Sequence, residues 1–359
     1  MNTTLKHWKE AATLILAASH KLGADSLSRS STSAFMPNAY VFPGGMVHSS
    51  DFSSEWLDIF KSFSNSPNFG LRSVTQPVET RPPLFATDRL KLGSPIPGEV
   101  AFRICALRET FEESGVLLLD GRCTTDGEGP LHYKANDLCS RELNRWRDLV
   151  NLNPSNFIKM CRELEVLPNI WALHEWSNWL TPAGRYGVKR FDTAFFICCL
   201  QEIPHALQDE KEIVCLEWST PSDVLQSYRA QELWIAPPQV YELSRMCHVP
   251  RLDDLHSFSR QRATEGCEQL LPVVSLKDEH YTALLPGDGC YPLTTSGEAG
   301  VGTSTDSQLE NPQEEDSALH RIVTVDPYTI TLQITITPKY NHLLPVLAPT
   351  SQYDSKSRL

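Results

Sequence analysis

The chain has 359 residues, of which 41% are hydrophobic, so it can bury at least one full core and is expected to be globular. Its formal net charge of −12 argues against DNA or RNA as the main partner, because nucleic-acid binders usually present a basic surface. No apolar run approaches the roughly 20 residues that a membrane-spanning helix needs, and the N-terminus lacks the apolar stretch of a secretion signal. We therefore expect no nucleic-acid partner and no membrane span.

The cysteines give no sign of a disulfide framework or a zinc site. The ten cysteines lie between Cys105 and Cys290 without a C-x-x-C pair or a Cys/His group at zinc spacing. Several fall inside apolar runs such as residues 195–200, where cysteine behaves as a small hydrophobic residue. This pattern is typical of reduced thiols in an intracellular protein.

The first hundred residues predict two strands followed by an irregular insertion. Residues 11–18 and 39–42 have the composition of strands. Pro43-Gly44-Gly45 is expected to end the second strand, because proline cannot donate to the ladder and glycine tolerates unusual backbone angles. Residues 49–99 are rich in Ser, Pro and Asn, which predicts an insertion with one short helix near residues 56–63.

A long helix is predicted from about Gly98 to Ser114, because its apolar residues recur at helical spacing on one face. Gly115 is a natural residue to end it. Residues 116–119 then predict a brief strand. Residues 140–176 predict mainly helices, as part of a helical decoration at about 120–176 that covers the core.

The chain beyond these helices predicts a second β region and two more helices. Strands are expected at residues 179–181, 192–200 and 212–218, where β-branched and aromatic residues are frequent. Helices are expected at residues 221–230 and 237–246. These elements should complete a mixed α and β core.

Residues 241–359 are expected to form a C-terminal extension. Within it, residues 291–319 are dense in Gly, Ser, Thr and acidic residues, which predicts a flexible segment. Residues 321–336 alternate apolar and polar positions and predict a return to a sheet. The last three residues, Ser357-Arg358-Leu359, are similar to the Ser-Lys-Leu peroxisomal address.

Three carboxylates share one exposed face of the predicted long helix. At about 100° per residue, Glu109, Glu112 and Glu113 cluster opposite the apolar stripe. Like charges at this spacing oppose each other by roughly 0.2–0.5 kcal/mol per pair, and acids in a last helical turn oppose the helix dipole. One interpretation is a solvated polar face. The other is a site for Mg²⁺ or Mn²⁺, hard cations that bind carboxylate oxygens and bridge to phosphates.

The residues around the glutamates favour the metal interpretation. The stretch Arg108-Glu109-Thr110-Phe111-Glu112-Glu113-Ser114-Gly115-Val116 matches the pattern R-E-U-x-E-E-x-G-U, in which U is apolar and Thr110 is a permissive choice. At these positions the sequence resembles the Nudix hydrolase family. The resemblance implies that Glu109 and Glu113 bind the metal ion, that Glu112 is a further ligand or the general base, and that Arg108 orients a glutamate.

The other half of the Nudix box lies upstream. Val41-Phe42-Pro43-Gly44-Gly45 is similar to the strand end and glycine turn that open the box, and the resemblance assigns Gly44 and Gly45 to substrate binding. Asp51 stands where the family has a glutamate, and His48 is expected to be a loop residue rather than a ligand. An insertion at about 52–97 separates the two halves, which is a departure from the family pattern.

That insertion is itself similar to one branch of the family, the peroxisomal coenzyme A diphosphatases of the Nudix motif 19 type. The stretch 189–193, the overall length and the terminal Ser-Arg-Leu also fit that branch. The resemblance implies an α/β (α+β sandwich) Nudix fold over residues 8–240, in which a mixed sheet lies between helices.

Two further groups of residues are weaker candidates for the site. Arg185, Lys189 and Arg190 form a dense basic stretch beside a predicted strand, and they either hold a ribose 3′-phosphate or the diphosphate or are solvated loop charges. Glu210 and Glu212 precede another strand and are candidates for a late-loop base.

The resemblance implies a function as well as a fold. It implies Mg²⁺-dependent hydrolysis of coenzyme A and its acyl esters to 3′,5′-ADP and 4′-phosphopantetheine or its acyl form, in a peroxisome reached through the import receptor. Hydrolysis of another nucleoside diphosphate conjugate, such as ADP-ribose or NADH, stays open because the box handles only metal and diphosphate. A catalytically silent binding module stays open too: the intact glutamates count against it, and Asp51 and the split box count for it.

Overall fold

The computed structural model of the chain describes residues 8–19, 25–29, 41–63, 66–120, 139–182, 189–204, 217–277, 280–292 and 317–346. Within these residues the chain forms a seven-stranded mixed sheet and a four-stranded antiparallel sheet. No helix in the described ranges is long and apolar enough to span a bilayer.

The strands and helices follow one another in mixed order. The large sheet contains β1 (Lys9–Ser19), β2 (Asp25–Arg29), β3 (Gly44–Met46), β4 (His174–Leu180), β5 (Phe191–Leu200), β6 (Glu217–Ser219) and β7 (Gln269–Leu270). The second sheet contains β8 (Val273–Lys277), β9 (His280–Leu284), β10 (His320–Asp326) and β11 (Thr329–Ile334). The α-helices are α1 (Trp56–Ile59), α2 (Pro83–Ala86), α3 (Gly98–Ser114), α4 (Ser140–Leu152), α5 (Asn156–Glu163), α6 (Pro221–Arg229), α7 (Pro237–Met246) and α8 (Leu252–Arg262). Short 3-10 helices are η1 (Ser49–Phe52), η2 (Pro67–Gly70), η3 (Leu90–Leu92) and η5 (Ile170–Ala172).

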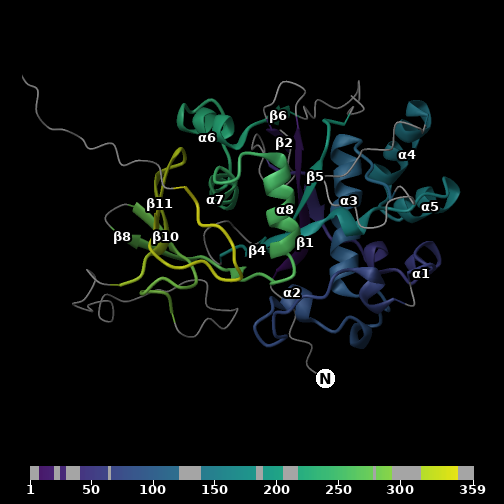
Figure 1. Ribbon diagram of the computed structural model, residues 1–359, viewed down its shortest axis with the longest axis horizontal. Coiled ribbons are helices and arrows are strands. Elements are labelled where there is room, and N and C mark those ends of the chain that lie inside the picture. Colours follow the sequence, from purple (N-terminus) through teal and green to yellow (C-terminus); the bar gives the residue numbers. More distant parts are fainter. Residues whose placement is uncertain are drawn as a thin grey trace, which may run out of the picture.

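The centre of the large sheet is the parallel pair β1 and β5, in which Leu14 lies opposite Phe196. Side chains on these strands point alternately to the two faces of the sheet. Leu14 and Phe196 join the core under α3, whereas Ile15 and Ile197 join the core under α6, α7 and α8. Figure 1 shows α3, α4 and α5 on one side of the sheet and α6, α7 and α8 on the other. The predicted fold class, a mixed sheet between helices, is confirmed.

The long helix carries the glutamates at the residues expected from the sequence. Helix α3 spans Gly98–Ser114, and Gly115 ends it in the left-handed conformation with φ 70°, which glycine adopts without a Cβ clash. The predicted helices at 221–230 and 237–246 correspond to α6 and α7. Residues 291–319, predicted to be flexible, lie largely outside the described residues.

Two predicted strands are wrong. Residues 41–42 form no more than a bridge, and β3 begins at Gly44, so the glycine turn that should end a strand instead starts one. The reason is that Gly44 and Gly45 pair with Thr13 and Ala12 of β1, and a Cβ on Gly44 would collide with that strand. Residues 116–119 form an isolated bridge from Leu119 to Pro168, because this segment is held by packing under the helices rather than by a ladder.

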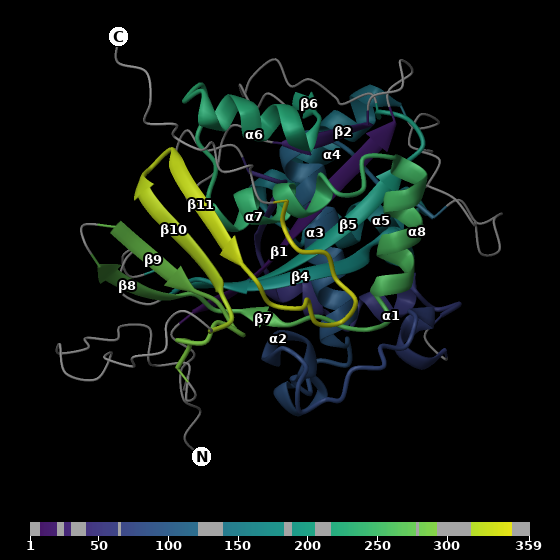
Figure 2. The same ribbon diagram turned by 60° about the vertical axis from the view of Figure 1, so that its left-hand side comes forward.

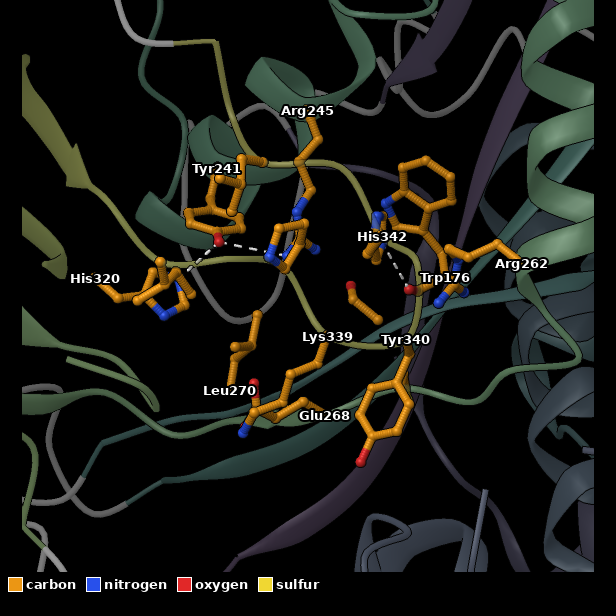
Figure 3. Close-up of a pocket in the computed structure, with 15 residues that line it drawn as sticks. Trp176, Tyr241, Arg245, Arg262, Glu268, Leu270, His320, Lys339, Tyr340 and His342 are labelled. Atoms are coloured by element: carbon orange, nitrogen blue, oxygen red, sulfur yellow. Dashed lines mark hydrogen bonds and ion pairs between the residues drawn. The ribbon is translucent and has the colours of Figure 1, made fainter. Parts of the chain in front are cut away.

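The chain after residue 246 adds helix α8 and the second sheet. Helix α8 was not predicted from the sequence. Figure 2 shows β10 and β11 of that sheet standing beside the end of the large sheet. A cavity of about 30 Å³ lies where the two parts meet, and Figure 3 shows the side chains around it. There the Tyr241 hydroxyl lies 2.7 Å from His320 Nε2, and His342 Nε2 lies 3.1 Å from the Trp176 carbonyl oxygen.

Buried ion pairs fasten the irregular insertion to the sheet. Arg81 donates to both oxygens of Glu175 on β4, at 3.0 and 2.6 Å, and Arg89 binds both oxygens of Glu10 on β1 at 2.9 Å. Glu175 is completely buried, so its charge depends on Arg81 for compensation. The insertion is therefore a fixed part of the fold despite its short helices.

We expect Arg81→Ala to lower the free energy of unfolding by about 3 kcal/mol, because the substitution leaves the Glu175 carboxylate buried without its main partner. Urea denaturation followed by circular dichroism measures the change. As a control, Arg162→Ala removes an ion pair with Glu55 in which both side chains are about half exposed, and it should change stability by less than about 1 kcal/mol. Equal effects of the two substitutions would contradict the anchoring role of Arg81.

Candidate active site

The glycine turn and the end of α3 lie against each other despite the insertion between them. The Gly44 N–H donates to Glu113 Oε2 at 3.2 Å. A Cβ on Gly45 would overlap the Glu109 carboxyl group, with 2.5 Å to its Cδ. A Cβ on Gly44 would stand 2.6 Å from the Ala12 carbonyl oxygen. Both glycines are therefore required for close approach, Gly44 toward strand β1 and Gly45 toward the carboxylate of α3.

The Arg108 guanidinium is the centre of the site. Its Nε and Nη2 each donate to one oxygen of Asp51 at 2.9 Å, which is a bidentate pair. Nη1 donates to Glu109 Oε1 at 2.7 Å and to Glu112 Oε1 at 2.8 Å, and Nη2 also donates to the Met46 carbonyl oxygen. Arg108 and Asp51 are both 1% exposed. The expectation that Arg108 orients a glutamate agrees with this geometry, in which it holds two.

Asp51 reaches Arg108 because η1 is capped locally. His48 is the N-cap of η1: its Nδ1 accepts from the Ser50 N–H at 3.1 Å, while its own N–H donates to Asp51 Oδ2 at 2.9 Å. His48 is thus a loop residue that fixes a turn, as expected. Both oxygens of Asp51 are used by Arg108, so Asp51 serves to position the arginine.

The three glutamates are held in a partly buried and mutually repulsive cluster. Burial raises the pKa of Glu113 to about 8, and the nearby Glu109 carboxylate adds to the increase. Burial also raises the pKa of Glu112 to about 7, against the opposing effect of Arg108, and raises the pKa of Glu109. Arg108 alone does not offset the accumulated negative charge, so the cluster favours an additional cation.

Arg147, on α4, stabilises the end of α3 and was not predicted from the sequence. Its Nε donates to the Glu112 carbonyl oxygen at 2.9 Å and its Nη2 to the Glu113 carbonyl oxygen at 2.7 Å. These carbonyls lie at the negative end of the helix dipole, where the acids are also placed. A buried guanidinium at this point therefore reduces the cost of putting three glutamates in the last turns of α3.

The donor set fits a divalent cation, although the described residues hold no group of three acid, His or Cys side chains already arranged around one point. Glu109 and Glu112 are turned to Arg108, and Glu113 is turned to the Gly44 N–H. All three are carboxylates that lie within five residues of one helix, and burial and repulsion favour added positive charge. These are the residues that would hold the ion.

Of the predicted basic group, the two described residues, Lys189 and Arg190, are not brought to the glutamates. Arg190 lies at the start of β5, where its Nε donates to the Thr181 carbonyl oxygen at 2.9 Å and its guanidinium stands over the Trp8 ring. The Arg190 carbonyl oxygen accepts a hydrogen bond from the Lys9 N–H. Lys9 lies four residues before Thr13, the residue that pairs with Gly44, so these two positions of β1 are about 13 Å apart. Lys189 is exposed beside Arg190. Arg185, like Glu210 and Glu212, lies outside the described residues.

Comparison with known proteins identifies the family. A family model described as the NUDT19 Nudix domain matches residues 8–246. The chain belongs to the NUDT19 family of Nudix hydrolases. A second model, the NUDT19 C-terminal domain, matches residues 274–335, which include strands β9, β10 and β11. Nudix hydrolases generally use a divalent metal ion to split diphosphates, so the chain is a Nudix diphosphatase.

Full-length relatives support the assignment to this family. The chain is 44% identical to the Xenopus laevis protein named "Acyl-coenzyme A diphosphatase NUDT19" and 45% identical to the Gallus gallus protein of the same name, over 100% of each chain. It is 40% identical to the Homo sapiens protein of that name over 94% of each. A solved Nudix hydrolase from Alicyclobacillus acidocaldarius, 22% identical, aligns with 70% of this chain and 96% of its own at a TM-score of 0.50, which supports the fold.

Substitutions of the two glycines in the turn should have different effects. We expect Gly45→Ala to leave the melting temperature nearly unchanged and to lower the apparent metal affinity by about tenfold or more, because the added Cβ meets the flexible end of Glu109 and forces that carboxylate aside. Gly44→Ala should instead unfold at lower temperature, because its Cβ meets the backbone of β1. Differential scanning calorimetry and metal titration separate the two effects. A destabilised Gly45→Ala with normal metal affinity would contradict this assignment.

Proposed function

We propose that this NUDT19-family chain hydrolyses the diphosphate of coenzyme A and acyl-coenzyme A. Water adds to one phosphorus while the bridging P–O bond breaks, which gives 3′,5′-ADP and 4′-phosphopantetheine or its acyl form. The support comes from relatives that are 40–45% identical over essentially the whole chain and are named acyl-coenzyme A diphosphatases. It also comes from the intact cluster of Arg108 with three glutamates at the glycine turn.

The proposed metal ion is Mg²⁺, with Mn²⁺ as a substitute, held by Glu109 and Glu113, with Glu112 as a third ligand or as the general base. When bound, it would neutralise charge that develops on the diphosphate and acidify an attacking water. Arg108 keeps Glu109 and Glu112 oriented, and Asp51 keeps Arg108 in place. Glu112, whose pKa is raised to about 7 by burial, is the proposed proton acceptor if it does not bind the metal.

A substrate panel tests the proposed specificity. With Mg²⁺ present, coenzyme A and an acyl-coenzyme A should be cleaved to 3′,5′-ADP far faster than ADP-ribose or NADH is cleaved, as judged by chromatography of the products. Faster cleavage of ADP-ribose or NADH would replace the proposed substrate. No cleavage of any of the four would support a silent binding module.

Glu113→Gln should lower turnover of coenzyme A by roughly 100-fold while the fold stays intact, because it removes a negative metal ligand needed in the transition state. The matched control is Glu142→Gln, an exposed glutamate on α4, which should leave turnover unchanged. Steady-state kinetics over a range of Mg²⁺ concentrations provide the measurement. A Glu113→Gln variant with normal activity and normal Mg²⁺ dependence would rule out this residue as a ligand.

We also propose that Ser357-Arg358-Leu359 directs the protein to peroxisomes through the import receptor. The support is the small, basic and leucine residues of the tripeptide and the polar run before it, all of which lie outside the described residues. A fluorescent fusion should give a punctate peroxisomal signal, and deletion of Leu359 should make it cytosolic. An unchanged distribution after the deletion would reject the address.

A further inference from the structure

A groove far from the glutamates gathers basic side chains from two segments. It has a volume of about 330 Å³ and is lined by Arg72, His256, Ser257, Arg260, Gln261 and Thr264. Arg72 follows η2 in the insertion, and the other residues come from α8, apart from Thr264, which lies just after that helix. His174, the first residue of β4, adds a second imidazole, with its ring centre 5.7 Å from that of His256. The backbone contact from Thr75 to Thr264 holds the two segments together at 2.7 Å.

The basic side chains that face this groove have no hydrogen-bond or ion-pair partners within the described part of the chain. Arg72 and Arg260 make no hydrogen bond or ion pair there, and neither do the ring nitrogens of His174 and His256. His256 is also buried, because only 8% of it is exposed. It is therefore a polar side chain that is more than nine-tenths buried and has no hydrogen-bond partner among the described residues. By contrast the other two arginines of the insertion, Arg81 and Arg89, are paired with carboxylates. The chain carries a net charge of −12, yet these arginines and histidines, in the part of it that the structure describes, are left without acidic partners in one place. Such a local group of basic side chains offers a site for an anion.

The charges around the groove are almost all positive. Burial, with smaller effects from His256, Arg103, Arg72 and Arg260, lowers the pKa of His174 to about 3. Burial also lowers the pKa of His256, with Arg260 and Arg72 acting in the same direction and Asp253 in the opposite one. Both imidazoles are therefore neutral at pH 7, so each keeps one N–H donor and the positive charge comes from the arginines.

Two arginines and neutral imidazole donors match the chemistry of a phosphate group. A guanidinium presents a planar fork that binds two phosphate oxygens, and charge-assisted bonds of this type are the strong ones. The groove has space for a phosphate together with part of the molecule that carries it. We propose that Arg72, Arg260, His256 and His174 form a binding site for the phosphate monoester of a small phosphorylated molecule.

This phosphate groove is separate from the diphosphatase site. Arg103 donates to the Leu173 carbonyl oxygen and therefore stands beside His174. On α3 it lies ten residues before Glu113, which corresponds to about 15 Å along the helix axis. Helix α8 also packs on the opposite face of the large sheet from α3, as Figure 1 shows. A ligand in the phosphate groove is thus a second ligand and not the scissile diphosphate.

The test uses inorganic phosphate as the probe, with the full chain in a metal-free buffer and chloride replacing phosphate at constant ionic strength. Phosphate should raise the melting temperature in a saturable way, and Arg72→Gln/Arg260→Gln should weaken the apparent affinity by about tenfold or more. The matched control, Arg141→Gln/Arg251→Gln, removes the same charge from two exposed arginines outside the groove and should keep the wild-type affinity. Circular dichroism checks that both double variants are folded.

Activity measurements distinguish this proposal from the proposed diphosphatase function. Arg72→Gln/Arg260→Gln should cleave coenzyme A with kcat and KM within about twofold of the wild type, because the groove does not contact the reacting diphosphate. Equal phosphate affinity in the groove variant and the wild type, or no saturable binding by the wild type, would overturn the proposal. A raised KM for coenzyme A but not for dephospho-coenzyme A would also overturn it, since the groove would then belong to the substrate site.

Discussion

The buried pair between Arg108 and Asp51 is the interaction on which the active site depends. The insertion separates the two halves of the Nudix box in sequence, and the guanidinium joins them again in space by binding Asp51 and the Met46 carbonyl on one side and Glu109 and Glu112 on the other. Because Arg108 is only 1% exposed, its positive charge has to be compensated nearly completely by neighbouring groups. Asp51 supplies that compensation, so the aspartate that replaces a family glutamate is an anchor.

The glutamate cluster shows how the surrounding structure supports an arrangement that is locally unfavourable. Three acids at the end of a helix repel one another and oppose the helix dipole, and burial strengthens both effects. Arg108 and Arg147 both stabilise the cluster, the first by binding side chains and the second by binding backbone carbonyls. The remaining negative charge is what a divalent cation would balance, and it is why the site is suited to phosphate chemistry.

The sequence predicted local elements more reliably than long-range contacts. Helix α3, its glycine stop and the grouping of its acids follow from spacing within the helix and agree with the structure, but the acidic face expected to be exposed is partly buried. The start of β3 could not be predicted, because Gly44 and Gly45 look like a turn until their pairing with β1 is known. Arg147 gave no signal either, since an arginine on an amphipathic helix resembles a solvated residue until α4 is packed against α3.

The second sheet was underestimated for a related reason. Its strands are short and only partly buried, and the predicted segment 321–336 resolves into two of them, β10 and β11, joined by a tight turn. Periodicity detects the alternation of such strands but does not show that β10 pairs with β9, which pairs in turn with β8 in a separate stretch of chain. Helix α8 was missed because its apolar residues are few and its capping residue, Arg251, makes no side-chain cap.

The parallel pairing of β1 with β5 also determines the order in which the chain can fold. Lys9 pairs with Phe191, so the central strand of the sheet is synthesised long before its principal neighbour. Pairings of such large sequence separation are formed slowly, because a long loop has to close before any contact stabilises it. Until β5 leaves the ribosome, β1 can pair only with β2 and β3, so the face of the sheet that α6, α7 and α8 will cover stays exposed to wrong contacts.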